Sequence, residues 1–294
     1  MKGNNTGFKL FSLTSVWLWL GIFALLPNLA LLLVSFLDRG ETDFFIPLFT
    51  TGNYERLLDP AFINIFVESM YLACVSTAVC LLLGYPFAYL LARSNKRIRP
   101  WLMLLVVIPF WTNSLIRTYA LIIILKTQGL INKLLNLTGL VEGPFSLMYS
   151  DFAVFFGLTY TLLPFMILPL YASIEKLDLR MLEAARDLGA GALRTFWHIT
   201  LPLTLPGIVA GCILVFLPAL GIFYVPEILG GATNMLLGTF IKNQFLVSRD
   251  WPLGAAASTI LTFLLILMAL AYRLASRKAA DDIAPGARKK GGKK

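Results

Sequence analysis

Six long apolar runs separated by polar segments dominate this chain of 294 residues. The runs cover approximately residues 16–37, 65–92, 100–125, 151–173, 202–223 and 255–272. A helix needs about 20 mostly apolar residues to cross the hydrocarbon core of a bilayer, and each run is near or above that length. The pattern therefore predicts an all-α polytopic membrane protein with six transmembrane helices.

The run at 16–37 has one alternative interpretation, as a cleaved secretory signal peptide. It is longer than an ordinary signal core, and it lacks a small-x-small cleavage site. We therefore interpret it as the first span. The polar segment from Asp38 to Asn64 then forms the first loop.

The distribution of Lys and Arg predicts the orientation of the spans. Eighteen of these residues lie in the N-terminal arm, the 93–99 turn, the 175–202 segment and the stretch from Arg273 onward, against six in the three opposite loops. Cytoplasmic loops carry the excess of basic residues. Both termini and the 175–202 segment are thus predicted to be cytoplasmic, and the first loop periplasmic.

Composition narrows the kinds of chemistry to expect. Hydrophobic residues make up 58% of the chain and charged residues 14%, which is outside the balance of soluble domains. The three cysteines fall in predicted spans without metal-ligand spacing, and the single His198 lacks nearby ligand partners, so we expect no metal site. A Gly-rich phosphate loop of the Walker type is absent, so ATP hydrolysis would belong to another chain.

The net charge of +9 raises the possibility of nucleic-acid binding. However, the basic residues cluster beside apolar runs, and no aromatic residue interleaves the charges of the tail from Arg288 to Lys294. We expect this tail to lie near anionic lipid headgroups. A nucleic-acid partner is not expected.

The polar segment between the fourth and fifth runs has the pattern of two helices joined by a glycine. The first helix carries an apolar stripe of Leu177, Met181, Ala184 or Ala185, and Leu188. Gly189 is expected to end it in a left-handed conformation, which a residue without Cβ adopts easily. A second short helix should follow, with Leu193, Phe196, Trp197 and Leu201 on one side, before Pro202 opens the fifth span.

This segment reads Glu183-Ala184-Ala185, three residues, Gly189, nine residues, then Ile199-x-Leu201-Pro202. It resembles the EAA loop of permease subunits of ABC importers. The resemblance implies a cytoplasmic loop that sits in a groove of the ATP-hydrolysing subunit. It assigns ATPase coupling to Glu183, Ala184, Ala185, Gly189, Ile199, Leu201 and Pro202. The alternative is an amphipathic linker between spans, which would need no fixed Gly-to-Pro spacing.

Between Pro109 and Tyr119 the third run is unusually polar for a lipid-facing helix. At the standard helical rise, Arg117 lies about 25 Å along the helix from Pro100, near the periplasmic interface, where we favour snorkelling or an ion pair. Trp111 and Asn113 lie deeper. They either pack and hydrogen-bond between helices or contact solute, and the sequence favours neither.

The stretch from Pro218 to Gly231 stays apolar but contains two prolines, three glycines and Glu227, so it predicts a broken helix. Broken backbone at membrane depth lines a cavity or is buried in protein. Phe223 and Tyr224 beside Glu227 would offer ring faces and a negative charge to an amine cation. The alternative places Glu227 at the periplasmic surface and the rings in an interfacial belt.

A closer resemblance rests on five motifs taken together. They are Pro109 to Arg117, Leu163 to Met166, Glu183 to Ala190, Ile222 to Val225 and Arg249 to Pro252. From residue 57 to 277 the chain resembles the first permease subunit of spermidine/putrescine importers. The resemblance implies a type I ABC importer permease fold and polyamine import across the bacterial inner membrane, with a substrate path of Trp111, Asn113, Phe223, Tyr224 and Glu227.

The same resemblance implies the organisation and partners of the chain. Residues 1–64 would form an arm, the first span and a periplasmic loop, 65–275 the permease core with the coupling loop at 175–202, and 276–294 a basic cytoplasmic tail. Partners would be a second permease, two copies of an ATP-binding subunit and a periplasmic substrate-binding protein. ATP and Mg²⁺ would bind the ATPase, and this chain would bind no cofactor.

Two alternatives remain at this point. The first keeps the importer and changes the cargo to another small solute. The second is a membrane-embedded enzyme, but the sequence lacks a paired nucleophile and base, a His cluster or a metal motif.

Overall fold

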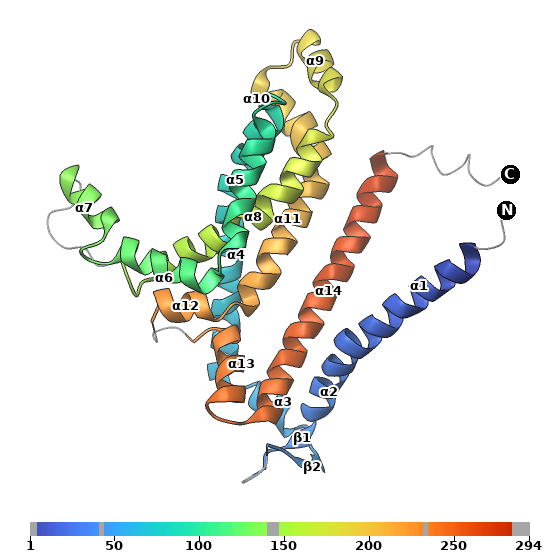
Figure 1. Ribbon diagram of the computed structural model, residues 1–294, viewed down its shortest axis with the longest axis vertical. Coiled ribbons are helices and arrows are strands. Elements are labelled where there is room, and N and C mark those ends of the chain that lie inside the picture. The colour runs from blue at the N-terminus through green and yellow to red at the C-terminus, as the bar shows by residue number, and fades with distance from the viewer. Residues whose placement is uncertain (1–4, 41–43, 140–146, 232–234, 284–294) are drawn as a thin grey trace. The chain divides into compact units, whose positions relative to one another are not determined.

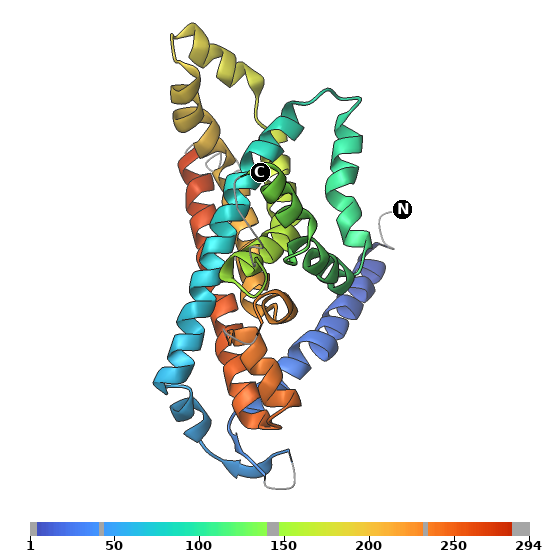
Figure 2. The same cartoon turned by 90° about the vertical axis from the view of Figure 1, so that its left-hand side faces the viewer.

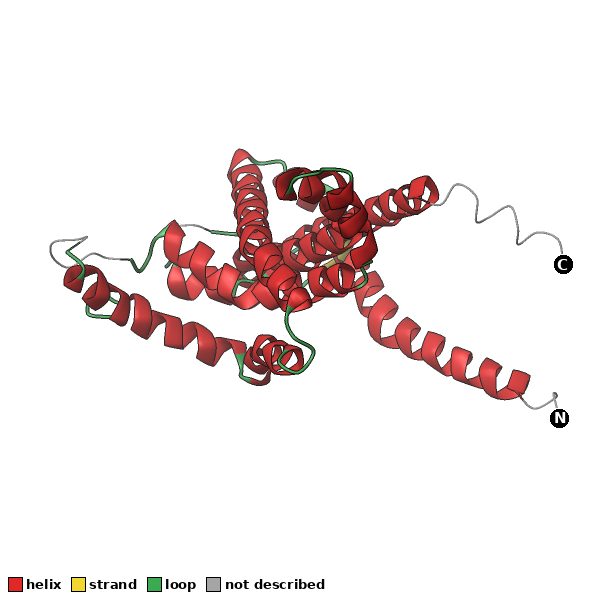
Figure 3. Cartoon of the chain, turned by 90° about the horizontal axis from the view of Figure 1, so that it is seen from above, coloured by secondary structure: helices red, strands yellow, loops and turns green. Residues whose placement is uncertain are grey.

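The computed structural model describes residues 5–40, 44–139, 147–231 and 235–283, and most of this part is helical (Figure 3). Six helices in it are long and apolar enough to cross a membrane, which confirms the six predicted spans. They are Lys9–Val34, Pro60–Arg93, Ser114–Leu134, Asp151–Glu175, Ala192–Gly221 and Trp251–Leu274. The chain forms two compact units, one of Met1–Asn64 with Phe240–Ile266 and one of Ile65–Thr239 with Leu267–Lys294.

The first unit contains the first span and the segment that follows it. The span consists of α1 (Asn5–Leu20), the π-helical turn η1 (Gly21–Leu25) and α2 (Leu26–Val34). A short antiparallel pair, β1 (Leu37–Asp38) and β2 (Ile46–Phe49), precedes α3 (Gly52–Arg56). The end of α13 (Leu237–Leu246) and the start of α14 (Trp251–Ile283) complete this unit.

The second unit is built around α4 (Pro60–Arg93), α8 (Asp151–Glu175) and α11 (Leu201–Gly221), which lie side by side (Figures 1 and 2). One face of α8 is buried along its length at every fourth position, namely Leu158, Leu162, Met166, Leu170 and Ile174. This spacing keeps one stripe facing the neighbouring helices. The unit therefore has its core along α8.

The seam between α8 and α11 depends on small residues. Gly207 and Gly211 are four residues apart on α11, the spacing that lets membrane helices approach closely. A Cβ added at Gly207 would lie 2.9 Å from the carbonyl oxygen of Pro169, and one at Gly211 would lie 2.7 Å from Sδ of Met166. The backbones of the two helices are thus in direct contact.

The third predicted span is not one continuous helix. Helix α5 (Arg99–Trp111) ends at Thr112, whose backbone is extended, and Asn113 caps α6 (Ser114–Leu125) by accepting a hydrogen bond from the Leu115 N–H at 2.8 Å. Figure 2 shows α5 and α6 running in different directions, and α7 (Leu130–Leu137) follows. The estimate of depth for Arg117 along a continuous helix was therefore wrong, because Asn113 supplies a helix start within the apolar run.

The fifth span begins earlier than the sequence pattern predicted. Helix α10 (Ala192–Thr195), the π-helical turn η2 (Phe196–Thr200) and α11 follow one another without a break. Pro202 lies in the first turn of α11, directly after the π-turn, so its missing N–H removes one hydrogen bond from the continuous helix without ending it. The predicted separate second helix is thus the beginning of the fifth span.

The predicted break after the fifth span is confirmed. Helix α11 ends at Gly221, Ile222 is extended, and a separate short helix α12 (Tyr224–Leu229) follows. It packs against α8 and α6. A Cβ at Gly157 of α8 would lie 2.9 Å from Val225, so this contact also requires a small residue.

Candidate functional site

The segment between α8 and α11 forms two helices and a tight turn at one end of the second unit (Figure 1). Helix α9 (Leu179–Asp187) starts at Asp178, whose side chain accepts a hydrogen bond from the Arg180 N–H at 3.0 Å. Leu182 and Ala185 are its buried residues. Met181 and Leu188, which belong to the predicted apolar stripe, are 50% and 88% exposed.

Gly189 ends α9 in a Schellman motif, as its position in the sequence predicted. Its φ is +79°, in the left-handed region. The Gly189 N–H donates to the carbonyl of Arg186 at 2.8 Å, and the Ala190 N–H donates to that of Ala185 at 3.0 Å. These two bonds satisfy carbonyls that the helix end would leave open. Backbone conformation therefore sets the angle between α9 and α10.

A shallow groove of about 420 Å³ opens between the two arms of this turn. Its lining is mostly apolar and consists of Met181, Ala184, Ala185, Leu188, Ala190, Arg194, Thr195, His198 and Ile199. The Nδ1 of His198 lies 3.0 Å from the carbonyl oxygen of Arg194, so the ring is held at one edge. The exposed stripe of α9 thus becomes one wall of a surface that an apolar partner group would fill.

The coupling residues suggested by sequence occupy both arms of the turn. Glu183, Ala184, Gly189 and Pro202 are exposed, Ile199 and Leu201 are half-buried, and Ala185 is buried. The structure thus brings Ala184, Ala185 and Ile199 into the lining of the same groove. Leu201 and Pro202 lie beyond it, in the first turn of α11.

The second arm of the turn joins the membrane span without a flexible linker. The ring of Tyr85 on α4 contacts that of Phe196 on η2 edge-on, with centroids 5.6 Å apart. The Tyr85 hydroxyl also lies 3.0 Å from that of Thr204 on α11. Helices α10, η2 and α11 are thus continuous, and the side chain of Tyr85 ties both η2 and α11 to α4.

An ion pair anchors the other end of the segment, at the end of α8. Arg99 donates to Oε1 of Glu175 at 2.7 Å and also to the carbonyl oxygens of Ala92 and Ser94 at 2.8 and 3.3 Å. This contact ties the basic 93–99 turn to the start of the 175–202 segment. Sequence reasoning missed it, because Arg99 and Glu175 are 76 residues apart.

The predicted path residues are divided among the end of α5, the start of α6 and α12. Phe223 and Tyr224 have perpendicular rings with centroids 6.1 Å apart, and Glu227 is exposed one turn further on α12. Trp111 at the end of α5 is 77% exposed. The side chain of Asn113 caps α6 instead of joining two helices, so its observed role is local.

Arg117 and Glu68 are charged groups within candidate membrane spans. The guanidinium of Arg117 lies over the ring of Tyr160 on α8, 6.0 Å from its centroid, within the range of a cation–π contact. Glu68 is exposed in the candidate span formed by α4. The sequence analysis did not single out Glu68, although a carboxylate inside an apolar run indicates a candidate functional residue. Among the described residues, no group of three His, Cys, Asp or Glu is arranged to hold a metal ion.

Comparison with known proteins identifies relatives over most of the chain. Residues 84–280 match the family described as binding-protein-dependent transport system inner membrane component. The chain is 50% identical over 283 residues to the spermidine/putrescine transport system permease protein PotB of Salmonella typhimurium, covering 95% of this chain and 99% of that protein. The protein of the same name from Escherichia coli is 52% identical over 259 residues, covering 88% and 94%.

A solved structure shares the fold. The bacterial alginate ABC transporter in complex with alginate pentasaccharide-bound periplasmic protein has a chain that matches with a TM-score of 0.71, covering 93% of this chain and 96% of that one. Sequence identity is 17%, so this likeness concerns the arrangement of helices alone.

Proposed function

Because the chain belongs to the family of binding-protein-dependent transport system inner membrane components, we propose that it is one permease subunit of an ATP-driven polyamine importer. It is a multi-pass protein of the inner membrane. The observation that supports the cargo is the identity of 50% and 52%, over nearly the whole chain, to permeases named for spermidine and putrescine.

In this proposal the chain forms half of the translocation path and a second permease forms the other half. Two ATP-binding subunits hold ATP and Mg²⁺, and a periplasmic binding protein delivers the cargo. This chain is not catalytic. The turn at Gly189 docks on an ATP-binding subunit, with an apolar partner group in the groove beside Ala184 and Ile199 and a basic partner group near Glu183.

The geometry supports a direct coupling. The turn has a fixed angle, and its second arm is continuous with α11. The glycine seam between α11 and α8 leaves little freedom for one helix to slide on the other. Movement of the docked turn would therefore move α8 and α11 together, and with them α12, which packs on α8.

The cargo contact proposed on this chain is the exposed face of α12. An ammonium group is attracted by the carboxylate of Glu227 and by the ring faces of Phe223 and Tyr224. Trp111 on α5 would add a further ring. The face carries a negative charge and aromatic rings, a combination that suits a polyamine better than an anion.

A binding-protein-dependent ATPase assay on the reconstituted complex, across a panel of amines and anions, tests the cargo. Stimulation by polyamines alone supports it, and stimulation by an anion alone contradicts it. Glu227→Gln keeps the size of the side chain and removes the charge, so polyamine uptake should fall while complex assembly and basal ATP hydrolysis persist. The matched control is Asp151→Asn, an exposed carboxylate in the first turn of α8. Equal polyamine uptake by the parent and Glu227→Gln would show that Glu227 is not part of the cargo site.

A further inference from the structure

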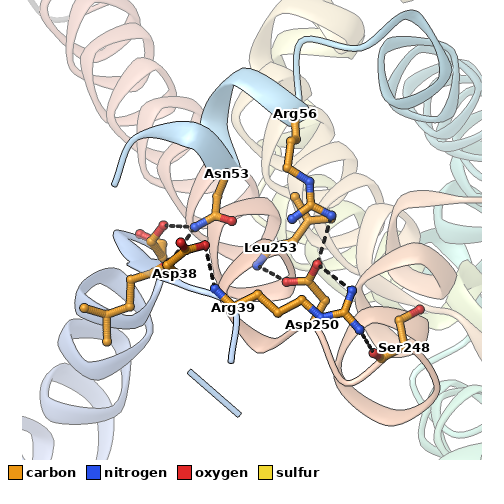
Figure 4. Close-up of polar contacts among 9 residues, drawn as sticks. Asp38, Arg39, Asn53, Arg56, Ser248, Asp250 and Leu253 are labelled. Carbon is orange, nitrogen blue, oxygen red and sulfur yellow. Dashed lines mark hydrogen bonds and ion pairs between the residues drawn. The ribbon is translucent and has the colours of Figure 1, made fainter. Parts of the chain in front are cut away.

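Asp250 is a buried carboxylate at the start of α14 in the first unit (Figure 4). Its side chain is 1% exposed. One oxygen, Oδ1, accepts a hydrogen bond from the Leu253 N–H at 3.2 Å and so caps the helix. The other, Oδ2, lies 2.9 Å from Nη2 of Arg56 and 3.7 Å from Nη1 of Arg39.

Both arginines come from the segment that follows the first span. Arg39 follows β1, and its Nη2 also donates to the carbonyl of Ser248 at 3.1 Å. Arg56 is the last residue of α3. Their side chains are 52% and 49% exposed, so each keeps contact with solvent while its guanidinium reaches the buried acid. A buried charge requires such compensation, because removing it from water is costly.

Aromatic contacts support the same junction. The ring of Trp251 contacts those of Phe44 and Phe245, with centroids 4.5 and 5.9 Å away. Arg249 has a φ of +52°, a strained backbone conformation for a residue with a Cβ. The turn before α14 is thus held in an unfavourable conformation that presents Asp250 to both arginines.

The segment itself is rigidly built. The Nδ2 of Asn53 donates to the carbonyls of Ser35 and Leu37 at 3.1 and 2.8 Å, and this side chain is buried. Phe36 contacts the rings of Phe49 and Tyr54. Because β1, β2 and α3 are joined internally, the two arginines orient all three as one body on the start of α14.

We propose that Asp250 is a positioning residue: through Arg39 and Arg56 it holds β1, β2 and α3 in the orientation that the periplasmic binding protein engages. This inference rests on the proposed function, which supplies that partner. It gives a role to the Arg249–Asp250–Trp251 motif, which neither the coupling turn nor the path uses.

The first test measures the position of the segment without any partner. In the complete importer complex, hydrogen–deuterium exchange of the β2 and α3 amides is compared between the parent, Asp250→Asn and Arg56→Met. Asn retains the oxygen that caps α14, so Asp250→Asn removes the charge alone. We expect exchange at α3 to rise about tenfold, equivalent to about 1.4 kcal/mol. Unchanged exchange in both variants would overturn the proposal.

The matched control is Glu55→Gln, which removes a charge from the residue beside Arg56. Within the described part of the chain, Glu55 makes no ion pair with an Arg or Lys. The β2 and α3 amides of Glu55→Gln should exchange at the same rate as those of the parent. An equal rise in this control would mean that the net charge of α3, and not the Asp250 cluster, holds the segment.

A double variant separates the cluster from an ordinary loss of stability. Arg56→Met leaves Asp250 buried with only the more distant Arg39, whereas adding Asp250→Asn removes the uncompensated charge. The double variant should therefore exchange more slowly than Arg56→Met alone. Additive effects of the two substitutions would contradict a direct pair.

The second test connects the cluster to the partner. In the reconstituted complex, Asp250→Asn should raise the binding-protein concentration that gives half-maximal ATPase stimulation about tenfold, with basal ATP hydrolysis unchanged. Faster exchange without this shift would overturn the positioning role. A parent complex that no amine-loaded binding protein stimulates would refute the proposed polyamine function instead, and the exchange comparison would still decide whether the cluster positions the segment.

Discussion

The turn at Gly189 and the seam at Gly207 both require glycine, but for opposite physical reasons. At Gly189 an added Cβ would meet no atom within 4 Å, yet φ is +79°, so the restriction lies in the residue's own backbone. At Gly207 the backbone is helical, and an added Cβ would meet Pro169 and Ser173 of α8. Gly189 thus sets the angle between α9 and α10, whereas Gly207 sets how closely α11 approaches α8.

This difference separates two kinds of function. A turn that controls direction affects how a surface is presented to a partner, while the folded helices around it persist. A seam that controls distance supports the packing of the unit itself. Substitutions at Gly189 should therefore reduce transport-coupled ATP hydrolysis, whereas substitutions at Gly207 should reduce the stability of the subunit.

The largest effect is expected for Gly207→Ala. The nearest atoms include the Pro169 carbonyl, which cannot rotate away as a side chain can, so the helices must separate. We expect a loss of about 2 to 3 kcal/mol of stability. Thermal unfolding of the detergent-solubilised subunit measures it. Gly221→Ala is the control on the same helix, because its Cβ would meet nothing, and equal losses in the two variants would contradict the contact.

A smaller effect, with a different readout, is expected for Gly189→Ala. The left-handed conformation costs a residue with a Cβ about 1 to 2 kcal/mol. Membrane insertion and unfolding of the spans should stay close to those of the parent, while transport-coupled ATP hydrolysis falls. The control is Gly191→Ala, two residues later, where space is equally open but φ is −65°. If both variants hydrolyse ATP like the parent, the fixed angle is not required for coupling.

The smallest effect is expected for Gly211→Ala, at the second glycine of the seam. Here the nearest atom is Sδ of Met166, the end of a flexible side chain, at 2.7 Å. The side chain can rotate, so we expect a loss of about 1 kcal/mol or less in the same thermal assay. A loss larger than that of Gly207→Ala would show that the backbone contact at Pro169 is not the closest constraint.

Sequence reasoning succeeded where the cause is local. The six apolar runs predicted six spans, because the thickness of a bilayer acts on contiguous residues. The break after Gly221 and the left-handed Gly189 were also predicted, since both follow from the backbone preferences of glycine and proline. The span boundaries were less accurate, as the continuous helix from Ala192 to Gly221 shows.

The break between α5 and α6 was missed although its signal was present. Thr112 and Asn113 are residue types that favour helix starts, but the surrounding apolar run outweighed them in the pattern. A helix break inside a hydrophobic segment is tolerated where neighbouring helices or side chains satisfy the freed backbone groups. Here α6 packs against α8 and α12, which lie later in the chain.

By itself, the sequence determined the number of membrane spans, the position of the turn at Gly189 and the conformation of that residue, because each depends on residues within one short stretch. Only the tertiary structure decided that Arg56 would meet Asp250, 194 residues away, and that Gly207 would face Pro169. Such pairs arise when separate helices pack. The sequence does not reveal these contacts, because the two residues of each pair are far apart in the chain and neither residue type by itself indicates a partner.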